Sequence, residues 1–226
     1  MKKSIFTLAL VLAAIVSSAQ ESWFFPDEGK VNRYSTTATA LTEKTTLYTS
    51  VYVKSADNGA YTVQSTVFQN ENDTNPMQSV SAVYKTVQGG YELDMRETLK
   101  SSFAALGDLK VEEYSGDAVY PKNPSVGQSY DNITMTLGAN IQGNAFNISV
   151  EVKDRKITAK ETIEVPAGKF DCLKFEETTI AKVMGQEIKT QTTTWIAKGI
   201  GTVKQETDSM NGMVKAVMEL TAVKNK

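Results

Sequence analysis

The sequence predicts an all-β protein in which an antiparallel meander forms a curved sheet or partly open barrel, with one short helix near residues 97–106. Three observations favour this class. The chain is rich in Thr, Val, Ser and Tyr, residues that suit a half-buried strand. Apolar and polar residues alternate over several segments. Turn signals recur at short intervals between these segments, as they do in a hairpin meander.

The first residues are typical of a secretory signal peptide. Lys2 and Lys3 form a short positive region, residues 5–16 are almost all apolar, and small residues lead to a cleavage site after Ala19. We therefore expect residues 20–226 to form a single β domain. The apolar run is shorter than the roughly 20 residues of a membrane-spanning helix, so we expect no transmembrane anchor.

An N-terminal set of strands is expected over residues 30–96. Asn58-Gly59 predicts a tight hairpin turn, because both residue types tolerate the positive φ that such turns need. Gly89-Gly90 predicts a second turn of the same kind. The strands delimited by these turns are 45–55, 60–69, 80–87 and 91–95.

The middle of the chain breaks the two-residue period. Leu99, Phe103 and Leu106 follow helical spacing, and Gly107 is suited to end a helix, which gives the prediction over 97–106. Prolines at 121 and 124 would interrupt a sheet ladder. Residues 97–129 are therefore expected to cross from the N-terminal strands to a C-terminal set over 130–223.

Alternation is clearest in the C-terminal set. Phe146, Ile148, Val150 and Val152 alternate with polar residues and predict a strand with one apolar face, ended by a turn at Asp154-Arg155. Further turns are predicted at Ala167-Gly168, Gly185 and Asn211-Gly212. In the last strand, one apolar face comprises Val214, Ala216, Met218, Leu220 and Ala222.

Three stretches carry a family resemblance. They are Phe25-Pro26-Asp27-Glu28-Gly29 leading to Tyr34, Tyr120-Pro121 to Val126-Gly127, and Val165 to Phe170 followed by Trp195 and Gly199 to Lys204. In these stretches the chain resembles TapB-like exported bacterial proteins of unknown function. The resemblance implies a curved or partly closed antiparallel sheet in an envelope protein, and a more distant similarity to half-barrels that carry lipid or lipoprotein in the periplasm. It implies no catalytic or binding residues.

Read from the residues alone, the glycines of these stretches have structural roles. Gly168 suits the positive φ of a tight turn. Gly199 and Gly201 predict a bulge or a close approach of another backbone segment.

Composition excludes several kinds of chemistry. The chain has no histidine, which removes Ser-His-Asp and Cys-His nucleophiles and the common zinc sites. Its one cysteine, Cys172, cannot form an intramolecular disulfide and is expected to be a buried hydrophobe. With three arginines, scattered lysines and a net charge of −2, no nucleic-acid partner is expected. We expect no metal and no cofactor.

A site built from carboxylates alone remains open, because glycosidases need only two of them. The candidates are Glu161, Glu164 and Glu176. Alternation places Glu161 on the face of Ile157 and Ile163, where an acid needs a partner. A salt bridge or a slipped register would explain the acid at this position without catalysis, so we do not expect this protein to be an enzyme.

Three functions remain open for an exported, periplasmic protein, with secretion or outer-membrane association as alternatives. The favoured one is binding of a lipid or other apolar ligand on the curved sheet, for which the candidate residues are Phe103, Phe146, Ile148, Val150, Met218 and Leu220; the alternative at each is a filled core. The second is an envelope interaction protein using sheet edges or Trp23 to Phe25, unless these aromatics tuck into the barrel end. A carboxylate hydrolase is the weakest.

One modification is also predicted. Asp208-Ser209-Met210 resembles the short O-glycosylation motif of exported Bacteroidetes proteins, and we expect Ser209 to lie in an exposed turn.

Overall fold

The computed structural model describes residues 22–40, 42–103, 108–115, 118–141, 144–183, 185–209 and 212–226. The description of side chains excludes residues 99, 100, 102, 103, 108–112, 139–141, 144–146 and 183. The predicted signal peptide, residues 1–19, lies outside the described residues.

The described chain is almost entirely β-structure. In chain order the elements are β1 (Lys30–Ala40), β2 (Glu43–Asp57), β3 (Ala60–Phe68), β4 (Gln78–Val87), β5 (Gly90–Leu93), α2 (Met95–Phe103), β6 (Asp108–Ser115), β7 (Val119–Pro121), β8 (Ile133–Ile141), β9 (Asn144–Val165), β10 (Gly168–Val183), β11 (Gln186–Ala197), β12 (Gly201–Ser209) and β13 (Val214–Asn225). The all-β class with one short helix is confirmed.

All 13 strands belong to one antiparallel sheet, in the order β6-β8-β9-β10-β11-β12-β13-β1-β2-β3-β4-β5-β7. The sheet is open, because different strands lie at its two ends. Pairing of β13 with β1 joins the C-terminal strands to the N-terminal strands. The predicted turns at Asn58-Gly59 and Gly89 are confirmed, with φ of 47° and 77° in the first and 83° in the second.

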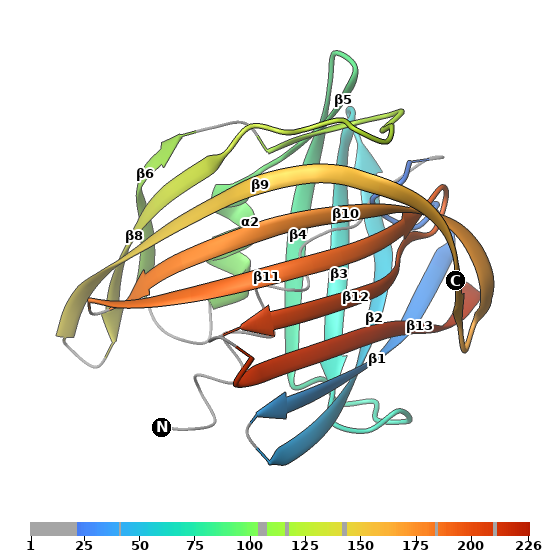
Figure 1. Ribbon diagram of the computed structural model, residues 1–226, viewed down its shortest axis with the longest axis horizontal. Coiled ribbons are helices and arrows are strands. Elements are labelled where there is room, and N and C mark those ends of the chain that lie inside the picture. Colours follow the sequence, from blue (N-terminus) through green and yellow to red (C-terminus); the bar gives the residue numbers. More distant parts are fainter. Residues whose placement is uncertain are drawn as a thin grey trace.

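The sheet curls into two crossing layers, with β8 to β13 lying in front of β2, β3, β4 and α2 in Figure 1. Helix α2 packs against β6, which ends the sheet on one side, and against β4, the third strand from the other end. The short β5 leaves part of β4 unpaired, and α2 covers it: the Ser81 N–H donates to Ser101 Oγ at 2.7 Å. The helix thus protects an edge that would otherwise expose backbone groups.

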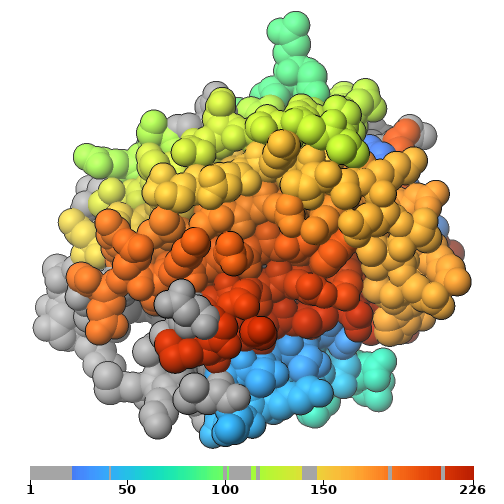
Figure 2. Space-filling view, in the orientation of Figure 1, coloured from blue at the N-terminus to red at the C-terminus, as the bar shows by residue number. Residues whose placement is uncertain are grey.

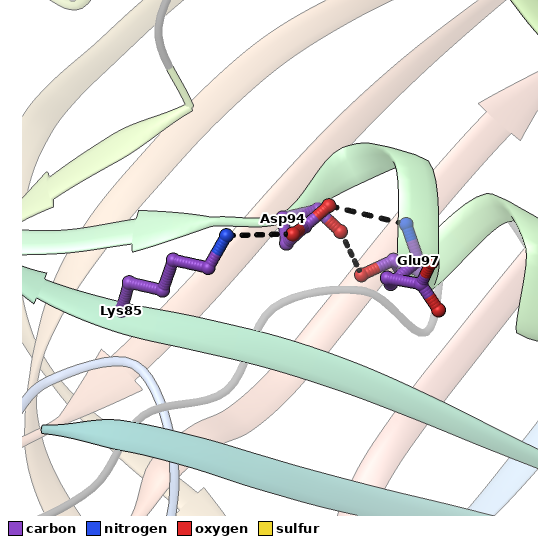
Figure 3. A network of polar contacts seen from close by, with 4 residues as sticks. Lys85, Asp94 and Glu97 are labelled. Atoms are coloured by element: carbon purple, nitrogen blue, oxygen red, sulfur yellow. Dashed lines mark hydrogen bonds and ion pairs between the residues drawn. The ribbon is translucent and has the colours of Figure 1, made fainter. Parts of the chain in front are cut away.

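Helix α2 begins at Met95, two residues before the predicted start. The reason is Asp94. Its carboxylate accepts a hydrogen bond from the Glu97 N–H at 3.2 Å and forms an ion pair with Lys85 at 2.9 Å (Figure 3). An aspartate in this position is a favourable N-cap. The predicted end of the helix, residues 104–106, lies outside the described residues.

The predicted turn at Asp154-Arg155 is wrong, because β9 runs through it. Asp154 does adopt a positive φ of 56°, but it forms a β-bulge. Lys156 pairs with Glu176 and Lys153 with Thr178, so Asp154 and Arg155 together lie opposite Glu177. An extra residue of this kind bends a strand and changes which side chains face inward. Arg155 therefore points into the molecule.

A second bulge alters the last strand. Tyr34 pairs with Leu220 and Arg33 with Ala222, so Thr221 is the extra residue. Beyond it the alternation shifts by one, and Val223 pairs with the buried Asn32 and packs against the core. The predicted apolar face therefore ends at Leu220.

The segment before β1 fills one end of the curled sheet. Phe24 and Phe25 are fully buried, and their rings contact tyrosines of β3, β4, β5 and β7. Together they form the aromatic cluster, which comprises Phe24, Phe25, Tyr61, Tyr84, Tyr91 and Tyr120. The sequence left open whether the N-terminal aromatics meet a partner or pack into the barrel end, and the structure shows that Phe24 and Phe25 pack into the barrel end.

Gly201 makes this arrangement fit. Its φ is +82°, and a Cβ there would lie 3.0 Å from the Cα of Phe25. The Gly199 N–H also donates to the Ser22 carbonyl at 2.8 Å, and the Asp27 N–H donates to the Gly199 carbonyl at 3.1 Å. The predicted close approach of another backbone segment is confirmed.

Candidate functional site

The inner face of the front layer has an apolar part. Residues that lie opposite each other on neighbouring antiparallel strands point to the same face. By this rule Met135 of β8, Val150 of β9 and Ala181 of β10 form one row, and all three are buried. Leu137 and Ile148 form a parallel row beside it. These rows give the sheet an apolar wall near α2.

Four of the six predicted binding residues have described side chains. Ile148 and Val150 lie on β9 and are 9% and 6% exposed, while Leu220 on β13 is fully buried and Met218 is partly buried. Three strands separate β9 from β13 in the sheet, so these residues form two pairs within one core cluster. The side chains of Phe103 and Phe146 lie outside the described residues.

The surroundings of Met218 are polar. Its row across the sheet contains Thr194 of β11, Gln205 of β12 and Thr36 of β1. All three are buried, and Gln205 Nε2 donates to Thr194 Oγ1 at 3.0 Å. The inner face therefore combines an apolar wall on β8 to β10 with a hydroxyl and amide wall on β11 to β1.

A buried arginine lies at the junction of β9 and the crossing segment. Arg155 is 2% exposed, and its guanidinium lies over the rings of Tyr120 and Tyr130 at 5.4 and 5.6 Å. Its Nη1 donates to the Asp131 carbonyl at 2.9 Å, and its Nε lies 3.6 Å from Glu177 Oε2. Both rings and Asp131 belong to β7 or the segment after it. Arg155 thus ties that segment to β9.

Charge and burial oppose each other at this centre. Burial raises the pKa of Glu177, and the nearby guanidinium of Arg155 only partly offsets this. Burial also raises the pKa of Tyr130, and the charge of Arg155 again offsets only part of this increase. Nε and Nη2 of Arg155 have no hydrogen-bond partner among the described residues; Nε has the ion pair with Glu177, and the guanidinium also lies over the two tyrosine rings.

Sequence reasoning missed this centre, although a signal was available. Arg155 lies two residues before Ile157, in phase with the apolar face, but the turn assigned at Asp154 removed it from the strand. Glu177 carried no signal, because a bulge alone turns it inward.

The carboxylates considered for catalysis have separate partners. The predicted position of Glu161 on the apolar face is wrong: a bulge at Thr158 shifts the register beyond Ile157, and Glu161 is exposed, where it accepts a hydrogen bond from Trp195 Nε1 at 2.8 Å. Glu164 pairs with Lys169 at 3.2 Å on the surface. Lys174 lies 2.9 Å from Glu176 and lowers the pKa of that carboxyl, the opposite of the shift that a general acid needs.

Two smaller predictions concern Cys172 and Ser209. Cys172 is fully buried as expected, and burial, with the charges of Asp171 and Glu161, raises the pKa of its thiol to about 12. Ser209 is not in an exposed turn: it ends β12 with 2% exposure and shares a 2.8 Å hydrogen bond with Thr190. In the folded protein its hydroxyl is therefore inaccessible to glycosylation.

The described part of the chain has neither a candidate metal cluster nor a candidate membrane-spanning helix. It contains no group of three His, Cys, Asp or Glu side chains placed to hold a metal ion. None of its helices has the length and apolar character needed to cross a membrane.

Comparison with known proteins places the chain in a family. Two solved structures share the fold at a TM-score of 0.61: a Bacteroides fragilis protein named as exported, with a YmcC-like fold, and a Parabacteroides distasonis protein named as a lipoprotein. They are 22% and 19% identical to this chain, cover 90% and 91% of it, and are themselves covered completely.

At this identity the likeness concerns the fold alone. A search of curated proteins found no match. The model of the DUF3108-like family matches residues 27–220, which is most of the chain. The chain therefore belongs to the DUF3108-like family.

Proposed function

We propose that this chain is a non-catalytic, exported envelope protein that binds a lipid or other apolar ligand between α2 and the inner face of β8 to β10. The observation that carries the proposal is the apolar wall of Met135, Val150, Ala181, Leu137 and Ile148 on the strands next to β6, which α2 contacts. An apolar surface with few polar groups is typical of small-molecule sites.

The polar wall supports a ligand with a head group. Thr194 lies on β11, the strand next to β10, and Gln205 and Thr36 follow further along the sheet on β12 and β1, so the end of a chain packed on β8 to β10 would meet hydrogen-bonding groups on β11. Export agrees with the predicted leader and with the names of the two similar structures. We place the protein in the periplasm, and retain as proposals its narrower resemblance to TapB-like proteins and to lipid-carrying half-barrels.

The test is recovery of ligand from the native protein. Protein purified gently from its cells is analysed by native mass spectrometry and organic extraction, and thermal shifts are measured with phospholipid and fatty acid. We expect bound lipid and a raised melting temperature. Val150→Thr should weaken fatty-acid binding about tenfold by placing a hydroxyl in the apolar wall.

The matched control is Val217→Thr on the exposed face of β13, which should leave binding unchanged. Protein that is empty when taken from cells, and that gives no thermal shift with either lipid, contradicts the proposal.

The second candidate is an envelope interaction protein. Its aromatic version loses support, because Phe24 and Phe25 are buried. Its sheet-edge version is favoured by β6, which ends the sheet and pairs on one side only, with β8, among the described strands. An unpaired edge of this kind can accept a strand from a partner.

A further inference from the structure

The outer face of the sheet carries a groove lined by both polar and apolar residues, and it shares only Met135 and Val150 with the apolar wall of the proposed function. It has a volume of about 730 Å³ and lies over β6, β8, β9, β10 and β11. This volume falls within the roughly 300–1,000 Å³ of sites that hold small ligands. The outer sides of β9, β10 and β11 face the viewer in Figure 1, and Figure 2 shows the same face with its atoms filled.

Strand register aligns the groove's side chains into rows. Glu113, Thr136, Ser149, Lys182 and Glu187 lie opposite one another on five successive strands. With neighbouring strands about 4.8 Å apart, this row is roughly 19 Å long. A second row beside it contains Ser115, Thr134, Glu151 and Ile180. A linear ligand could therefore lie across the strands.

The charges of the groove are largely paired within it. Lys153 lies 3.6 Å from Glu151, and Lys182 lies 3.5 Å from Glu187. Glu113 accepts a hydrogen bond from Thr136 Oγ1 at 3.5 Å. The remaining net charge of the groove is that of one carboxylate. An uncharged ligand therefore fits the groove better than a strongly charged one, and an anion would be repelled.

Hydroxyls, carboxylates and ammonium groups alternate along the rows. A ligand that fits this pattern must both donate and accept hydrogen bonds at short intervals, as the hydroxyls of a sugar do. Ser115, Thr134 and Ser149 are exposed and available for such bonds. Ile180, half-buried among them, offers apolar surface to the C–H side of a sugar ring.

We propose that this outer groove binds an uncharged oligosaccharide lying across β6 and β8 to β11. The test is a nuclear magnetic resonance titration of ¹⁵N-labelled protein with maltohexaose and chitohexaose, and with a hexamer of galacturonic acid as the anionic comparator. At least one neutral hexamer should shift the amides of residues 134–136 and 149–151. The anionic hexamer should bind more weakly, because Glu113 repels it.

The double variant Thr134→Val, Thr136→Val should weaken binding of the neutral hexamer about tenfold, since it removes two hydroxyls from neighbouring rows. Thr162→Val is the matched control, because Thr162 is exposed on β9 outside the groove. Dispersed amide spectra show that each variant is folded. Glu151→Gln, which changes a carboxylate of the second row, tests the same groove independently of the two threonines.

Three results would overturn the proposal: no amide shifts with either neutral hexamer, wild-type affinity in the double variant, or equal binding of the anionic hexamer. The groove shares Met135 and Val150 with the apolar wall, but the lipid test measures extracted lipid and thermal shifts, whereas this test measures amide shifts with sugars, so failure of one proposal is distinguishable from failure of the other.

Discussion

At the residue scale, Arg155 joins parts of the chain that are distant in sequence. Its guanidinium contacts Tyr120 of β7, Tyr130 and the Asp131 carbonyl, while its backbone belongs to β9. The backbone adds to this link, since the Tyr130 N–H donates to the Arg155 carbonyl at 2.9 Å. One charged side chain thus holds the crossing segment against the sheet, with Glu177 as its counter-charge.

Replacing Arg155 should therefore destabilise the fold strongly. Arg155→Met removes the hydrogen bond to Asp131 and leaves Glu177 without its counter-charge, and should lower the free energy of unfolding by about 3 kcal/mol. Adding Glu177→Gln should cost less than the sum of the two single changes, because the two groups interact. Urea unfolding measures both effects.

Arg96→Met, at an exposed position of α2, is the control and should lie within about 0.5 kcal/mol of the wild type. A similarly small effect of Arg155→Met would show that the arginine does not hold the segment.

At the element scale, α2 owes its start to one residue. Burial alone would raise the pKa of Asp94, but Lys85 and the Glu97 N–H outweigh this, and the pKa is lowered. Ionised Asp94 therefore stabilises the folded state. This contribution is present above the ordinary pKa of the carboxyl, 3.8, and is lost as the pH falls through the lower folded value.

Asp94→Ala should lower the free energy of unfolding by about 1 kcal/mol at neutral pH, because it removes the cap and the ion pair. The difference from wild type should shrink in strongly acidic solution, where Asp94 is protonated in both states. Lys85→Met removes the ion pair and keeps the hydrogen bond to Glu97, so it separates the two effects. Equal stability of Asp94→Ala and wild type at neutral pH would contradict this role.

At the scale of the whole molecule, the N-terminal segment connects the two layers. Phe25 contacts Tyr61, Tyr84 and Tyr91 of the back layer, while its backbone lies against Gly201 at the start of β12. The curled sheet is thus closed at this end by a segment that belongs to no strand.

A side chain at Gly201 should push this segment away. Gly201→Ala adds a Cβ 3.0 Å from the Phe25 backbone and also places alanine at positive φ. Gly185→Ala also places alanine at a positive φ, +78°, but it adds no close contact, since nothing lies within 4 Å of the Cβ position.

We expect Gly185→Ala to cost about 1 kcal/mol of unfolding free energy and Gly201→Ala clearly more. Denaturant unfolding gives both values. If the two costs are equal, the contact between Gly201 and the N-terminal segment contributes nothing to stability.

Much of the fold can be predicted from local patterns. The alternation around Ile148 and Val150 and the turn at Asn58-Gly59 depend on neighbours in sequence, and they appear in the structure as expected. Only part of the candidate site can be predicted from local patterns. The apolar residues of β9 could be found, but the partners of Met218 could not, because they come from three other strands.

The sequence by itself determined the all-β class, the hairpin turns and the limits on chemistry set by the absence of histidine, since composition and period are local properties. Only the tertiary structure decided where Arg155 points, where Phe25 lies and which side chains form the outer rows. A bulge reverses the inward and outward faces of a strand, and register joins residues that are far apart in sequence. Both depend on the packing of the whole sheet.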